Sequence, residues 1–266
     1  MNLKTIVVPL DASHHSERAL PIAESLAERV NAGLLLVSAQ FHGPLDPTGY
    51  LGEMAARVTR CPVDTIATKR EDAPMVIADA LDDHEDRIVC MTTHGRGSAR
   101  WAALGSVAEE VIRRTDQPLL LLGNNCRSDF LERGTHLLAC ANRPDAAASL
   151  ADPTRVWAEA LGLPRDVAVV VHPLDVPSAE HSETVLDPIA SALGVSSEHA
   201  VLLRRNSVAG ALTEYAEALP AALIAINSHA RAGFARFVLG SETMAVLRLA
   251  HCPVLVTHPC ADEKAN

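Results

Sequence analysis

The chain has 266 residues, of which 48% are hydrophobic and only 3% aromatic, and its 33 acidic and 23 basic side chains give a net charge of −10. The hydrophobic fraction is sufficient for a packed core and argues against bulk disorder. The shortage of aromatic residues argues against an all-β sandwich and against stacking on single-stranded nucleic acid. The acidic balance argues against a basic face that binds phosphate backbones, so we expect no nucleic-acid partner.

The sequence shows no targeting or metal-binding signal. The apolar run at its start is too short for a signal peptide, and no stretch approaches the roughly 18 apolar residues that span a bilayer. The six cysteines form no Cys-x-x-Cys pair, and the twelve histidines form no His-x-x-x-His pair with a nearby carboxylate. We therefore expect a cytoplasmic protein with reduced cysteines, no membrane partner and no metal site.

An internal repeat is the strongest organisational signal in the sequence. The Leu-Gly-Ser motif at 104–106 returns at 239–241, and the proline at 118, which precedes an apolar run, returns at 253. Both matches have an offset of 135, whereas the openings of the two copies, 6–11 and 137–142, match at an offset of 131. We predict a first domain over residues 1–125 and a second, degenerate domain over residues 130–262, joined by a short polar stretch rich in turn residues.

Each copy alternates strands with helices. In the first copy, continuous apolar runs predict buried parallel strands, and an apolar period of 3.6 residues predicts helices. The expected strands are residues 5–9, 34–39, 63–68, 87–92 and 118–122, and the expected helices are 16–30, 51–60, 74–84 and 106–115. We expect Pro21 to kink the first of these helices.

The second copy follows the same order. Its expected strands are residues 137–141, 167–171, 200–203, 223–227 and 254–257. The expected helices begin at Asp152 as cap with Pro153 in the first turn, near residue 183, at residue 208 and at Ser241. This alternation predicts the α/β class, with two tandem doubly wound, Rossmann-like parallel sheets of five strands in the order 3-2-1-4-5.

A candidate anion site follows from that topology. In an open α/β sheet, ligands bind at the carboxyl ends of strands where the strand order reverses. Asp11 ends the first strand, residues 92–97 follow the fourth, and a helix then begins near Gly105 and Ser106. The N–H groups of that helix start and its dipole would face a phosphate, although no Walker lysine motif is present.

Each of these pieces also has a purely structural interpretation. Asp11 can cap a helix or form a turn, and Gly95 and Gly97 can simply turn the chain. Ser106 and Glu109 fit a capping box, which would cap the helix whether or not a ligand is bound. Only the combination of these residues, in register and at the ends of neighbouring strands, favours a nucleotide site.

This combination resembles the universal stress protein family in its tandem two-domain form. The family signature is Gly-x-x-Gly, nine residues and Gly-Ser/Thr after the fourth strand, with an Asp after the first. Here Thr92 replaces the first glycine, whereas Gly95, Gly105, Ser106 and Asp11 match. The resemblance covers nearly all of the chain and implies non-covalent binding of ATP at the switch point.

The resemblance also implies roles for individual residues. Asp11 and Ser38 would flank the nucleoside, Thr92 and Gly95 the ribose and phosphates, and the segment 105–107 the phosphates. The threonine adds a Cβ beside the ribose, and the segment between the second and third strands is shorter than is usual in the family. The candidate binding residues are Pro9, Leu10, Asp11, Ser38, Thr92, His94, Gly95, Arg96, Gly97, Gly105, Ser106 and Val107.

The second copy keeps only part of this pattern. Asn142 replaces the aspartate, and Ala230 stands at the counterpart of Gly95. Gly240 and Ser241 are retained, so a weaker second site is expected at Asn142, Gly240 and Ser241. A retained helix start whose role is packing is the alternative.

These observations favour a stress-response protein that binds ATP, with or without Mg, or else AMP or ADP, and that is not a conventional enzyme. Two alternatives stay open. One is a nucleotide-free dimerising module of the same fold, and the other is a slow ATPase or adenylate-transferring enzyme. The last strand of each copy is apolar and lies at a sheet edge in the expected order, which favours pairing within the chain and a homodimer between chains.

Overall fold

The computed structural model describes residues 3–39, 46–70, 72–82, 84–93, 104–172, 180–228 and 239–257. Contacts within the chain divide it into two compact units, Met1–Leu122 and Gly123–Asn266. Among the described residues, no helix combines the length and the apolar character needed to cross a bilayer.

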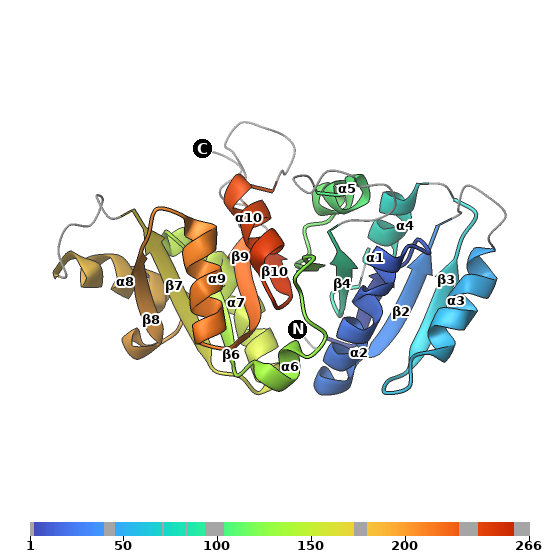
Figure 1. Ribbon diagram of the computed structural model, residues 1–266, viewed down its shortest axis with the longest axis horizontal. Coiled ribbons are helices and arrows are strands. Elements are labelled where there is room, and N and C mark those ends of the chain that lie inside the picture. The colour runs from blue at the N-terminus through green and yellow to red at the C-terminus, as the bar shows by residue number, and fades with distance from the viewer. Residues whose placement is uncertain are drawn as a thin grey trace. The chain divides into compact units, whose positions relative to one another are not determined.

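The first unit is the doubly wound sheet that the sequence predicts. All its strand pairs are parallel, in the order β3-β2-β1-β4-β5 (Figure 1). Its elements are β1 (Thr5–Pro9), α1 (His14–Glu17), α2 (Ala19–Val30), β2 (Gly33–Ser38), α3 (Pro47–Ala56), β3 (Val63–Ala67), α4 (Ala73–Asp79), β4 (Arg87–Thr92), α5 (Ser106–Arg114) and β5 (Leu119–Leu122).

The second unit repeats this arrangement. Its strands are also parallel, in the order β10-β9-β6-β7-β8, which is the same order read from the other end. Its elements are α6 (Phe130–Arg133), β6 (His136–Cys140), α7 (Pro144–Leu161), β7 (Arg165–Val171), α8 (Glu180–Leu193), the 3₁₀ turn η1 (Ser197–His199), β8 (Ala200–Arg204), α9 (Val208–Ala218), β9 (Ala221–Asn227), α10 (Ser241–Leu249) and β10 (Val254–Thr257). Both predicted offsets hold, because β1 and β6 begin at positions 5 and 136, and α5 and α10 at positions 106 and 241.

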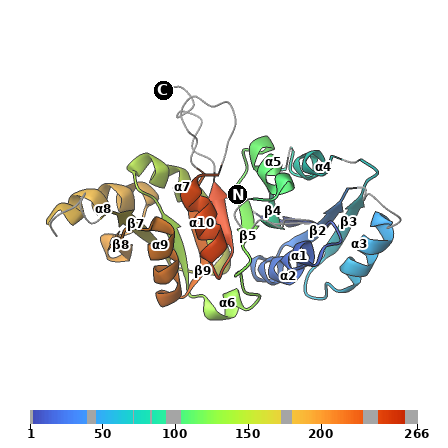
Figure 2. The ribbon, with the colours of Figure 1, turned by 45° about the horizontal axis from the view of Figure 1, so that its top comes forward.

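The core of each unit lies on both faces of its central strands. Right-handed crossovers place the first two helices of a doubly wound sheet on one face and the last two on the other. Accordingly, α7 packs against α8 and α9 against α10 (Figure 2). The middle of β1 is fully buried, as are β5 and β10. Burial on both faces explains why these strands read as continuous apolar runs.

Three helix predictions in the first unit are wrong in detail, the simplest being the helix expected at 74–84, which already ends at Asp79 in α4. The single helix expected at 16–30 is divided at Arg18 into α1 and α2, so Pro21 falls in the first turn of α2 rather than at a kink. Proline is tolerated there because first-turn N–H groups have no acceptor within the helix. The helix expected at 51–60 begins earlier, at Pro47, because the Asp46 carboxylate accepts hydrogen bonds from the N–H groups of the first turn.

The first long helix of the second unit also begins earlier than predicted. The sequence offers two proline start signals, and the helix uses Pro144 rather than Pro153, which lies inside α7. A proline within a helix donates no backbone hydrogen bond. Side chains donate to two nearby carbonyls of the same helix: Thr154 Oγ1 donates to Leu150 O at 2.7 Å, and Arg165 Nη1 donates to Ala151 O at 3.3 Å.

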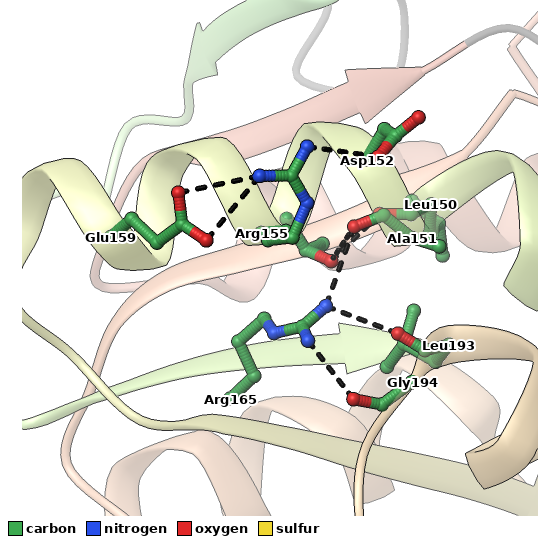
Figure 3. Close-up of polar contacts among 9 residues, drawn as sticks. Leu150, Ala151, Asp152, Arg155, Glu159, Arg165, Leu193 and Gly194 are labelled. Carbon is green, nitrogen blue, oxygen red and sulfur yellow. Dashed lines mark hydrogen bonds and ion pairs between the residues drawn. The ribbon is translucent and has the colours of Figure 1, made fainter.

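Arg165 joins this part of α7 to the end of α8. Besides Ala151, its guanidinium donates to Leu193 O and Gly194 O, both at 3.0 Å (Figure 3). The last carbonyls of a helix have no partner within it. A cation near them also interacts favourably with the negative end of the helix dipole. Partial burial lowers the pKa of Arg165 from its ordinary value. The side chain therefore satisfies three carbonyls from two helices at the start of β7.

We predict that Arg165→Met lowers the free energy of unfolding of the second unit by roughly 1–3 kcal/mol, because charge-assisted hydrogen bonds are lost while the aliphatic stem stays. Urea unfolding monitored by circular dichroism measures the change. Arg155→Met is the matched control on α7, because Arg155 pairs only with the exposed Asp152 and Glu159 among the contacts in Figure 3. Equal unfolding midpoints for the two variants would contradict the assignment.

Candidate functional site

The carboxyl ends of three neighbouring strands meet in the first unit. β1 pairs with β2 on one side and with β4 on the other, so the strand order reverses beside β1. Asp11 follows β1, Ser38 ends β2 and Thr92 ends β4. The structure therefore brings these three predicted residues to one edge of the sheet.

Asp11 organises the turn that leads from β1 into α1. Its Oδ1 accepts hydrogen bonds from the N–H of Ser13 at 3.0 Å and from Ser13 Oγ at 2.6 Å. Its own N–H donates to Ser16 Oγ at 3.2 Å, while the intervening Ala12 adopts a left-handed φ of 57°. The turn-forming role that the sequence offered for Asp11 is thus present. The sequence analysis missed both serines, although an Asp-x-Ser spacing is a known turn signal.

Ser38, Leu10 and Pro9 form a fixed wall of the strand-end region. The Ser38 side chain is buried and its hydroxyl donates to Leu10 O at 2.8 Å. Leu10 is itself buried, and its N–H donates to Val37 O at 2.9 Å, which extends the β1–β2 ladder by one bond. Pro9 is the last residue of β1 and is half-buried. These residues shape the edge mainly through their backbone.

The start of α5 is anchored beside the end of β4. Thr93 N–H donates to Leu122 O at 3.1 Å, and Gly105 N–H donates to Thr93 O at 2.7 Å. Gly105 is the N-cap residue, so the helix begins at Ser106 and Val107. The first N–H groups of a helix have no acceptor within it. Ser106 is exposed, and Gly105 and Val107 are half-buried.

The capping box predicted for this helix does not form. Ser106 is the first helical residue rather than the cap, and no side chain caps the helix. Glu109 instead accepts a hydrogen bond from Arg113 at 3.2 Å, one turn further along. The loop residues His94, Gly95, Arg96 and Gly97 lie outside the described residues.

Tyr50 is a residue near this edge that the sequence analysis missed. It is buried on α3, and its hydroxyl donates to Glu17 Oε1 at 3.3 Å. Burial raises the pKa of Tyr50 above its ordinary value, and the negative charges of Glu17 and Asp11 raise it further. Tyr50 therefore stays a neutral donor close to Asp11. Among the described residues, no group of three His, Cys, Asp or Glu side chains is arranged to hold a metal ion.

The second unit closes its corresponding edge with a side chain. Asn227 ends β9, as Thr92 ends β4, and its Nδ2 donates to Ala146 O at 2.7 Å and to Ser149 Oγ at 3.0 Å. Its Oδ1 accepts a hydrogen bond from Thr257 Oγ1. These bonds tie the end of β9 to the first turns of α7 and to β10. The sequence analysis missed this tie.

The predicted residues of the weaker site stand around this tie. Asn142 is exposed after β6, Gly240 is the N-cap of α10 with a φ of −62°, and Ser241 is the first helical residue. The helix start is thus retained in the second unit, as in the first. The residues between 228 and 239, which include Ala230, lie outside the described part of the chain.

Comparisons with known proteins agree on one family. The sequence profile of the universal stress protein family matches residues 2–123 and again residues 155–258. A universal stress protein from Thermus aquaticus is 30% identical over 139 residues, which cover 45% of this chain and 98% of that protein.

Solved structures show the same fold along the whole chain. A functionally unknown protein from Pseudomonas aeruginosa matches with a TM-score of 0.68 at 15% identity, covering 99% of this chain and 95% of that one. A universal stress protein from Archaeoglobus fulgidus matches with a TM-score of 0.65 at 15% identity, covering 96% of this chain and 98% of that one. Two profile matches in one chain and a fold that repeats at the same offsets lead to one conclusion: the chain belongs to the universal stress protein family, with two family domains in tandem.

Proposed function

We propose that the first unit binds ATP, or another adenine nucleotide, non-covalently at the carboxyl ends of β1, β2 and β4. The observation that carries this proposal is the anchoring of the α5 start at the point where the strand order reverses. There the backbone N–H groups of Ser106 and Val107 and the helix dipole suit a phosphate. Asp11 and Ser38 stand on the opposite side, where the resemblance to nucleotide-binding family members puts the nucleoside.

The proposed activity is binding rather than catalysis. Asp11 Oδ1 is already engaged by two hydrogen bonds from Ser13, so this oxygen is suited to holding a turn in shape rather than to abstracting a proton. The start of α5 offers N–H donors to a phosphate. Such donors can bind the nucleotide in its ground state, but they do not by themselves activate a water molecule. We infer a stress-response protein that binds nucleotide and is not a conventional catalyst.

Weaker nucleotide binding is favoured for the second unit. Asn227 occupies the position of Thr92 and is held by three protein partners. A ligand that needed this strand end would have to break at least one of those bonds. Together with an exposed Asn142 in place of Asp11, this supports a second unit that keeps the fold while binding nucleotide weakly.

We predict that Gly105→Val weakens ATP binding much more than it weakens folding. Gly105 has a φ of −62° and a ψ of 142°. Valine adopts this extended conformation readily, so the backbone tolerates the change. The branched side chain would shield the N–H groups that the phosphates need, and each charge-assisted bond lost is worth roughly 1.5–3 kcal/mol. Isothermal titration calorimetry measures the dissociation constant, and circular dichroism controls for the fold. An unchanged dissociation constant would refute the site.

We also predict that the intact chain has one tighter ATP site, located in the first unit. Gly105→Val should abolish it, whereas Gly240→Val, the matched change at the N-cap of α10, should have little effect. Both glycines have a φ of −62°, so the two substitutions impose the same backbone demand. Titration of each variant with ATP decides the matter. Two equal sites, or loss of binding only in the Gly240 variant, would reverse the assignment of the two units.

A further inference from the structure

The segment that leads into the second unit folds against the amino ends of its strands. Arg127 N–H donates to His251 O at 3.0 Å, and Thr135 N–H donates to Pro220 O at 2.7 Å. Between these two bonds lies the short helix α6, which contacts β9 and is labelled beside the start of that strand in Figure 1. The segment is therefore held to the second unit at both of its ends.

Glycine makes this close approach possible. A Cβ on Gly134 would lie 2.3 Å from Ala222 Cα, and a Cβ on Gly123 would lie 1.7 Å from Leu247 O. Real Cβ atoms do not tolerate such distances, so the backbone at both positions passes directly against β9 and α10. The segment is an integral wall of the second unit.

This wall forms one side of an open pocket of about 450 Å³. Its other sides are the end of α9, the start of β9 and the turn between α10 and β10. A volume of this size suits a small organic molecule. The pocket lies at the amino ends of the strands, the opposite end of the sheet from Asn142 and Gly240.

The pocket combines an apolar floor with a charged rim. Phe130, Ile224 and Cys252 are at most 4% exposed and form part of the floor. Burial raises the pKa of the Cys252 thiol to about 12, so the floor carries no charge near neutral pH. Arg127 and Arg133 stand at the rim, with side chains 47% and 61% exposed.

On one side of the rim the charges favour an anion, because two guanidinium groups stand there against one carboxylate, while Glu217 lies on the other side. Asp129 accepts from Arg127 at 3.2 Å and from Arg133 at 2.5 Å, so a single carboxylate serves two guanidinium groups. The arginine side of the rim therefore keeps a net positive charge and unused N–H donors.

The other side of the rim holds the pair of Glu217 and His251. His251 Nδ1 lies 2.5 Å from Glu217 Oε1, within ion-pair distance. In the described part of the chain, however, this buried nitrogen makes no well-formed hydrogen bond. The two side chains are close but poorly aligned, and a hydrogen bond weakens steeply as its angle departs from linearity.

We propose that this pocket binds a small organic anion, namely a carboxylate on a ring-sized apolar body. The body would fill the space beside Ala216 and Pro220, above the buried Phe130, and the carboxylate would reach Arg127 and Arg133. Arginine is suited to this role because its planar donors match the two oxygens of a carboxylate. The proposal concerns the second unit alone and does not depend on nucleotide binding by the first.

The probe for the test is 2-naphthoate, with 2-naphthylmethanol as its uncharged counterpart. We expect naphthoate to shift the methyl NMR signal of Ile224 in the full-length protein and to bind measurably by calorimetry. Arg127→Gln combined with Arg133→Gln should raise the dissociation constant of naphthoate about tenfold or more, since each charge-assisted bond is worth at least a factor of ten. The same double change should leave binding of the alcohol nearly unaltered.

Two further variants separate pocket binding from binding elsewhere. Ala216→Phe places a ring in the pocket from α9 and should abolish binding of both probes. Arg155→Gln, an exposed arginine on α7 outside the pocket lining, should change neither. The proposal is overturned if naphthoate leaves the Ile224 signal unmoved, if the alcohol binds as tightly as the carboxylate, or if the double arginine variant binds naphthoate as the parent does. Because the two arginines are exposed, these substitutions test the proposal even if Ala216→Phe does not fold.

Discussion

Where a buried parallel strand ends, the backbone N–H and C=O groups just beyond it still need hydrogen-bond partners. This requirement fixes the carboxyl ends of the strands in both units. In the first unit, Thr93 N–H donates to Leu122 O, and in the second, Ser228 N–H donates to Thr257 O. These two bonds occupy equivalent places in the repeat and close the same ladder. Buried backbone groups are almost always paired, so each strand end is fixed before any side chain contributes. The next element of the chain, whether a helix start or a side chain, then decides what the edge can bind.

The two units use that edge differently although their folds match. In the first, the hydrogen bond from Gly105 N–H to Thr93 O sets the start of α5 beside the end of β4. In the second, the side chain of Asn227 spans to Ala146 and Thr257 and occupies the strand end itself. An amide that is satisfied on both its donor and acceptor sides is costly to displace. The strand order of the two units is the same, whereas the side chain that ends β4 in one and β9 in the other differs.

The sequence predicted those features whose signals are local and redundant. Strand positions followed from apolar runs such as Leu119–Leu122, because a strand buried on both faces is apolar along its whole length. The offset of 135 followed from the repeated Leu-Gly-Ser motif and the repeated proline, and the offset of 131 from the matching openings of the two copies. Helix starts were less predictable, because Pro144 and Pro153 carry the same start signal and only packing selects between them. The tie made by Asn227 was out of reach, because its partner Ala146 lies 81 residues away in the sequence.

The segment that joins the repeats has become structure of the second unit, and its glycines explain how. A free linker would tolerate any side chain at residue 123, but here a Cβ would collide with the carbonyl of Leu247. A helix as short as α6 cannot show an apolar period, so Phe130 carries no recognisable signal in the sequence although it is nearly fully buried. Phe130 and Ile224 both belong to the lining of the pocket at the amino ends of the strands, and one side of this pocket is a wall that the repeated fold itself does not contain. In the second unit, Asn227 ties the carboxyl ends of the strands, and the pocket lies at their amino ends. The nucleotide proposed for the first unit and the organic anion proposed for the second would therefore bind at opposite ends of two related sheets.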